Sequence, residues 1–77
     1  MNDHQKQIYR YLLDRIAANE ISIGDKLPTE NQLAAQFSTG RLNAHYAVKA
    51  LERAGILRCD RRRGTTLLRC PQEYELG

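Results

Sequence analysis

A chain of 77 residues, 42% hydrophobic and 27% charged, has the length of one small domain and too many apolar residues for compositional disorder. No apolar run approaches the roughly 18 residues of a membrane-spanning helix, and the polar segment 1–7 excludes a secretory signal. So short a chain needs its apolar residues for its own core, which leaves few for a catalytic pocket on the order of 300 Å³ or more. We therefore expect a cytoplasmic protein that has no membrane contact and no enzymatic activity.

The positive charge lies in the second half of the sequence. Residues 1–40 carry a net charge of −1, residues 41–69 carry eight basic and two acidic side chains, and residues 70–77 contribute −2. Seven of those eight basic side chains are arginines, whose planar guanidinium groups fit phosphates and guanine edges. A basic block on a nearly neutral body indicates a polyanionic partner, most often nucleic acid. A solubilising surface is the alternative.

Apolar spacing predicts a long first helix and a short second one. Residues 5–19 repeat apolar side chains every three or four positions, as one face of a helix does. Lys26–Leu27 is expected to be extended, because Pro28 disfavours helix in the residue before it. Thr29 and Gln32 then form a capping box that opens the second helix.

The third predicted helix spans Arg41–Ala54. Gly40 precedes it as a weak N-cap, and Gly55 is suited to the left-handed position that ends a helix. One side of this helix is apolar and carries Ala44, Ala47, Val48 and Leu51. The other side carries Leu42, His45, Tyr46, Lys49 and Arg53. We expect the first set in the core and the second set exposed.

Two short segments of aliphatic and β-branched residues follow, Ile56–Cys59 and Thr65–Leu68, and predict the strands of a hairpin. Its five-residue tip, 60–64, contains three consecutive arginines. Three helices and a basic hairpin in this order are typical of a winged helix-turn-helix, a mainly α fold with a small β-hairpin. In that fold the third helix, about 41–54, enters the major groove of DNA, and the hairpin, or wing, lies on the backbone or in the minor groove.

The N-terminal half of the third helix carries the candidate base readers. Arginine and asparagine pair bidentately with guanine and adenine, so Arg41 and Asn43 are the first candidates, with His45 assisting. Tyr46 is expected to stack on the sugar–phosphate edge or to pack on the wing. Asn43 has an alternative role in helix capping, and Arg41 has one as an ordinary surface residue.

The wing supplies candidate phosphate or minor-groove contacts in Arg61, Arg62 and Arg63, because adjacent arginines repel one another unless an anion lies beside them. Their alternative is a solvated loop. Glu30, by contrast, is expected only to favour the dipole of the second helix.

Several stretches of the sequence carry a family resemblance: Gly24–Glu30, Gln32–Ala34, Phe37, Arg41, Ala50–Leu57 and Arg63–Thr65. With them, residues 8–68 resemble the N-terminal DNA-binding domain of the GntR family of bacterial transcription regulators, and most closely its HutC-type branch. The resemblance adds Asn31, Thr39 and Gly64 to the candidate DNA contacts. Several positions depart from the family's usual residues, namely Asn31, Leu42, Asn43, His45 and Arg62, so the usual operator consensus is not expected.

The resemblance also implies an assembly. GntR regulators are homodimeric repressors or activators that bind inverted-repeat operators in double-stranded DNA, and a larger C-terminal domain binds a small-molecule effector. We therefore expect residues 1–69 to be the DNA-binding domain and 70–77 to start a linker, with the effector domain absent from this chain. No cofactor is expected in the DNA-binding domain, and the fragment alone can be monomeric.

Two further readings remain open from the sequence. A winged helix can serve as a protein-interaction module with a basic wing, and exposed Leu42 and Tyr46 are compatible with that use. An RNA-binding winged helix is the other. The cysteines and histidines lack the spacing of a metal site, and a disulfide between Cys59 and Cys70 is not expected in the cytoplasm.

Overall fold

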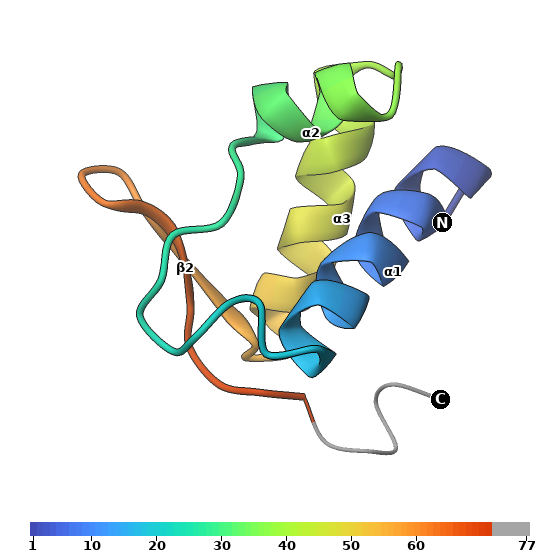
Figure 1. Cartoon of the computed structure of the whole chain (residues 1–77). Coiled ribbons are helices and arrows are strands. Elements are labelled where there is room, and N and C mark those ends of the chain that lie inside the picture. Colours follow the sequence, from blue (N-terminus) through green and yellow to red (C-terminus); the bar gives the residue numbers. More distant parts are fainter. Residues whose placement is uncertain (72–77) are drawn as a thin grey trace.

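A computed structural model describes residues 1–71 and contains three helices followed by an antiparallel hairpin (Figure 1). The elements are α1 (Asp3–Ala17), α2 (Glu30–Gln36), α3 (Arg41–Arg53), β1 (Leu57–Asp60) and β2 (Gly64–Leu67). In Figure 1, α1 lies beside α3, α2 lies across the N-terminal end of α3, and the hairpin lies on the other side of α3. This is the winged helix-turn-helix that the sequence predicts.

The core lies between the three helices and the base of the hairpin. Each element contributes its apolar side: α1 buries Ile8, Leu12, Leu13 and Ile16; α2 buries Leu33 and Ala34; α3 buries Ala44, Ala47, Val48 and Leu51; the hairpin region buries Ile56, Leu57 and Leu67. The side of α3 predicted to face the core is therefore the buried one. Because the core lies on that side, the opposite side of α3 is left for solvent or a partner.

The first helix begins and ends two residues earlier than its predicted range of 5–19. Asn2 is the N-cap, and its side chain accepts a hydrogen bond of 2.8 Å from the backbone N–H of Gln5. Asn19 has a φ of 60°, which lies in the left-handed region and ends the helix. The sequence analysis placed no cap at Asn2, and the boundary prediction was wrong for that reason.

The ends of α2 and α3 follow the predicted capping chemistry. Thr29 Oγ1 accepts from the backbone N–H of Gln32 at 3.1 Å, and the Gln32 side chain accepts from the backbone N–H of Thr29 at 2.8 Å. Gly40 is the N-cap of α3 without a side-chain hydrogen bond. Gly55 has a φ of 78° and closes α3, which ends at Arg53 with Ala54 as its C-cap, one residue before the predicted end.

The strand pairing agrees with the predicted strands, but each strand lies one residue closer to the tip than predicted. The strands pair Leu57 with Leu67 and Asp60 with Gly64, so the tip has three residues, 61–63, in place of the predicted five. The Asp60 carboxylate accepts hydrogen bonds from the backbone N–H groups of Arg62 at 2.7 Å and Arg63 at 3.3 Å. This side-chain turn closes a shorter loop than strand propensity alone predicts.

The segment before α2 pairs with the hairpin as well. Backbone hydrogen bonds join Gly24 N to Leu67 O at 2.8 Å, Leu67 N to Asp25 O at 3.0 Å, and Leu27 N to Thr65 O at 2.8 Å. The predicted extended piece at Lys26–Leu27 therefore lies along the outer edge of β2. These hydrogen bonds fix the position of the wing relative to α2 and α3.

Candidate nucleic-acid interface

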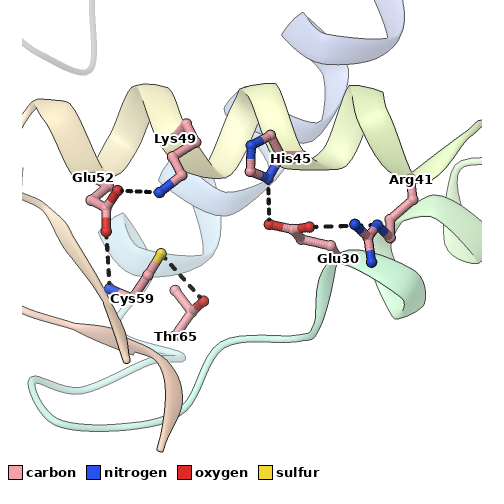
Figure 2. Close-up of polar contacts among 7 residues, drawn as sticks. All are labelled: Glu30, Arg41, His45, Lys49, Glu52, Cys59 and Thr65. Atoms are coloured by element: carbon pink, nitrogen blue, oxygen red, sulfur yellow. Dashed lines mark hydrogen bonds and ion pairs between the residues drawn. The ribbon is translucent and has the colours of Figure 1, made fainter. Parts of the chain in front are cut away.

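Glu30 connects α2 to the exposed side of α3 (Figure 2). Its Oε2 lies 3.0 Å from Nδ1 of His45, and its Oε1 lies 3.9 Å from Nε of Arg41. The Arg41 side chain is nevertheless 68% exposed, so most of its guanidinium donors face solvent. Glu30 thus contacts Arg41 and His45 on α3 and does more than favour the α2 dipole. Sequence spacing gave no signal for this contact, because the residues lie on different helices.

Asn43 points into a polar network between α3, the preceding turn and α1. Its Nδ2 donates to Thr39 Oγ1 at 2.7 Å, and its Oδ1 accepts from Asn2 Nδ2 at 3.0 Å and Gln5 Nε2 at 3.2 Å. Both lone pairs of the amide oxygen and one amide hydrogen are therefore used within the protein. Base reading by Asn43 stays a prediction, and it competes with this structural role.

The three arginines at the wing tip project from a turn that is held by a single side chain. Within residues 1–71, none of the guanidinium groups of Arg61, Arg62 and Arg63 forms an ion pair. The two N–H groups that the Asp60 carboxylate accepts from Arg62 and Arg63 hold its pKa below the usual value, with a smaller contribution from nearby arginines. The tip therefore keeps its shape while the guanidinium groups stay exposed.

A cleft of about 460 Å³ separates the wing from the N-terminal ends of α2 and α3. Its cationic side chains come from three segments: Lys26 before α2, Arg41 at the start of α3, and Arg62 and Arg63 on the wing. Asn31, Gly64 and one carboxylate, that of Glu30, line it as well. Four cations around one open cleft suit a chain of phosphates.

Lys26 was missed by the sequence analysis. It also lines a second hollow, of about 560 Å³, on the outer side of the hairpin with Arg58, Arg62 and Arg63. The sequence did predict the extended segment that contains Lys26. Its pairing with Thr66 of β2 was not predicted, and that pairing carries Lys26 to the wing.

The remaining predicted residues lie around α3 in two places. His45 and Tyr46 line a hollow between the N-terminus of α1 and α3, together with Lys49 and Arg53. Arg61 lines a hollow between α3 and the hairpin, which His45 also borders. The structure thus gathers Asn31, Arg41, Arg62, Arg63 and Gly64 in one cleft, and leaves Thr39, Asn43, His45, Tyr46 and Arg61 outside it.

Some of the basic residues have structural partners. Lys49 Nζ lies 2.9 Å from Glu52 Oε1, and this pair raises the pKa of Lys49 and lowers that of Glu52 (Figure 2). Glu52 also accepts from the backbone N–H of Cys59 at 3.3 Å, which links α3 to β1. Arg69 Nη2 donates to the carbonyl of Ala54 at 2.6 Å and caps the end of α3. At the wing tip, by contrast, the three arginines form no ion pair within residues 1–71, while Arg41 at the start of α3 is exposed but paired with Glu30.

The part of the chain that the structure covers holds no cluster of three or more His, Cys, Asp or Glu side chains able to bind a metal. Cys59 and Cys70 are free thiols, and partial burial raises the pKa of Cys59. None of the described helices is long and apolar enough to cross a membrane. Residues 72–77, most of the predicted linker, lie outside the described part.

The three helices and the paired hairpin define a winged helix-turn-helix domain, with a cationic cleft where its third helix begins. The chain belongs to the family described as bacterial regulatory proteins, gntR family, whose model matches residues 4–67. It is therefore a gntR-type DNA-binding domain of a transcription regulator. The prediction that the chain is not an enzyme is confirmed by this membership.

Solved structures of regulators share the fold. The DNA-binding domain of AraR in complex with operator ORR3 is 28% identical with a TM-score of 0.81, over 87% of this chain and 81% of that chain. BusR of S. agalactiae in complex with its busAB-promotor DNA is 25% identical with a TM-score of 0.76, over 90% of this chain and 33% of that one. A GntR family transcriptional regulator from Listeria monocytogenes is 24% identical with a TM-score of 0.79, over 99% and 68%.

Proposed function

We propose that this domain binds a specific sequence in double-stranded DNA, with α3 in the major groove and the wing on the adjacent backbone or in the minor groove. The cleft that joins Lys26, Arg41, Arg62 and Arg63 carries the proposal, because it places cations for the phosphate backbone on the wing opposite the arginine that begins α3. The AraR domain and BusR, which share the fold, are each described in complex with operator or promoter DNA.

Affinity and sequence reading are assigned to different groups. Arg62 and Arg63 neutralise phosphates, Arg61 and Gly64 extend that contact along the wing, and Asn31 meets the backbone from α2. The first turn of α3 contains no acidic residue, and Gly40 leaves its N–H groups uncapped by a side chain, which favours a phosphate there. Affinity from these contacts is independent of sequence and falls as salt rises.

Bases are read from α3. Arg41 is placed to pair with guanine, and its ion pair with Glu30 limits the directions that its guanidinium samples. His45 and Tyr46 follow one turn later on the same exposed side. Asn43 and Thr39 act mainly by holding the start of α3 in place, because their hydrogen bonds are made to each other and to α1.

The complete regulator is proposed to be a cytoplasmic homodimer that binds an inverted repeat, with repression as the expected mode. Residues 1–69 would be its DNA-binding domain and residues 70–77 the start of the linker. A C-terminal domain of the HutC type would bind the effector and dimerise. BusR supports a longer protein, since this chain covers 33% of it. The DNA-binding domain itself is proposed to need no cofactor.

Selection from a randomised duplex library at near-physiological salt, read by sequencing, tests the function. The chain itself should enrich one half-site, and the chain fused to an unrelated dimeriser should enrich an inverted repeat of it. Binding without enrichment would reduce the function to sequence-independent contact by a basic wing. An absence of binding would contradict DNA recognition and favour a protein-interaction module.

A further inference from the structure

Two large apolar side chains stand exposed on α3, one helical turn apart. Leu42 is 63% exposed and Tyr46 is 53% exposed. The other large hydrophobic side chains with such exposure in residues 1–71 are Met1, Ile23 and Leu68, which lie on other segments. Single exposed apolar residues are common on protein surfaces. A pair at i and i+4 on the side of the helix that faces away from the core forms a continuous apolar row.

This row lies beside the polar positions that the protein already uses for itself. Arg41 and His45 form the neighbouring i, i+4 row, and both are held by Glu30. Asn43, the residue best suited by type to adenine, has its amide oxygen fully engaged with α1. The side chains that α3 leaves free near its start are therefore the exposed part of Arg41 and the apolar row.

An apolar side chain can still distinguish bases in the major groove. Thymine alone among the four bases presents a methyl group there, at C5, and aliphatic or aromatic side chains recognise it by contact. Side chains at i and i+4 lie about 5–6 Å apart, which is between one and two base steps of about 3.4 Å along a strand. The row can thus lie against thymine methyl groups on neighbouring base pairs.

We propose that Leu42, with Tyr46 beside it, is a specificity-determining residue that reads thymine through its C5-methyl group. This inference rests on the proposed function and adds the chemical feature that α3 recognises in A·T pairs. The Tyr46 ring lies edge-on to the His45 ring, with centroids 6.2 Å apart and planes at 68°. Guanine reading falls to Arg41 and thymine reading to the apolar row.

The test removes only the methyl groups. Once selection has defined the half-site, each thymidine in it is replaced in turn by deoxyuridine, and the Kd of the chain is measured by fluorescence anisotropy. Loss of a buried methyl contact should weaken binding about fourfold at one or two positions. L42A should bind the thymidine duplex more weakly and should be insensitive to the replacement at those positions.

The control is L68A, which truncates a leucine that is 49% exposed just after β2, near the C-terminal end of α3 and not near the N-terminal end that carries Leu42. It should keep the full sensitivity to the methyl group. Equal Kd values for thymidine and deoxyuridine duplexes at every position would overturn the inference while leaving the proposed function intact. Undiminished methyl sensitivity in L42A would also overturn it. If no sequence is enriched in the first place, the proposed function fails, and the thymine reading with it.

Discussion

The start of α3 and the tip of the wing are both basic, but the protein treats them differently. At the start of α3, Arg41 is paired with Glu30, and Asn43 is bound to Thr39 and to α1. At the wing tip, the backbone is held by Asp60, while the arginine side chains form no ion pair with any residue up to 71. Restrained side chains suit sequence reading, and unrestrained cations suit phosphate contact. We therefore assign sequence specificity to the start of α3 and sequence-independent affinity to the wing tip.

Loss of the Arg41 side chain should have the largest effect on sequence discrimination. R41A should relax the preference at one base position by about 1–3 kcal/mol and change binding to unrelated sequences much less. Competition binding with single-base variants of the selected half-site measures this. The control R53A removes an arginine from the last turn of the same helix and should leave the preference unchanged. Equal loss of affinity for every sequence would instead assign Arg41 to the backbone.

Loss of the two arginines in the cleft should act on all sequences alike. The double variant R62A/R63A should weaken binding to specific and unrelated duplexes by a similar factor. The negative slope of log Kobs against log salt should become shallower by about 2, because two phosphate contacts are lost. A salt titration between about 50 and 200 mM measures the slope. R10A, which removes a cation from the exposed side of α1, is the control. An unchanged slope would contradict phosphate contact by the wing.

Neutralising Glu30 should release Arg41, so that the start of α3 resembles the wing tip in having an arginine without an ion pair. E30Q keeps a hydrogen-bond acceptor near His45 but removes the negative charge beside Arg41, so affinity for unrelated DNA should rise by about threefold, the scale of an exposed ion pair. Discrimination between the half-site and unrelated sequence should fall. Parallel Kd measurements on both duplexes report this ratio, with E20Q as a control outside the cleft. A higher discrimination in E30Q would contradict a restraining role for this carboxylate.

The smallest expected effect is on the shape of the wing tip at low pH. The pKa of Asp60 is held below its usual value, so its hydrogen bonds are present above the ordinary pKa of about 4 and are lost as pH falls through the lowered pKa. The amide signals of Arg62 and Arg63 in NMR spectra should stay constant from neutral pH to about 5 and shift below about 4. D60N, which retains an acceptor oxygen, should show no such shift. A midpoint near neutral pH would contradict the assignment.

The sequence predicted what depends on local patterns. Apolar spacing located the three helices, the box at Thr29 located the start of α2, and Gly55 located the end of α3. It could not predict contacts between elements that are distant in sequence. Tertiary packing determines three such contacts: Glu30 bonds to His45, Asn43 bonds to the N-cap of α1, and Lys26 lies beside the wing. The pairing of the two strands was predicted correctly, but the tip was predicted two residues too long because the hydrogen bonds of Asp60 close a tighter turn.

The segment before α2 makes the base of the wing stiff. With Gly24, Asp25 and Leu27 bonded to β2, that strand has hydrogen-bonding partners on both edges from Thr65 to Leu67, which restrains the hairpin. We expect the largest backbone motion of the hairpin at residues 61–63, beyond the last strand pair. The backbone amides of Leu27 and Leu67 should therefore exchange slowly with solvent, while those at the tip exchange quickly. In a complex with DNA, we therefore expect the base of the hairpin to keep its position while its tip adjusts to the local width of the groove.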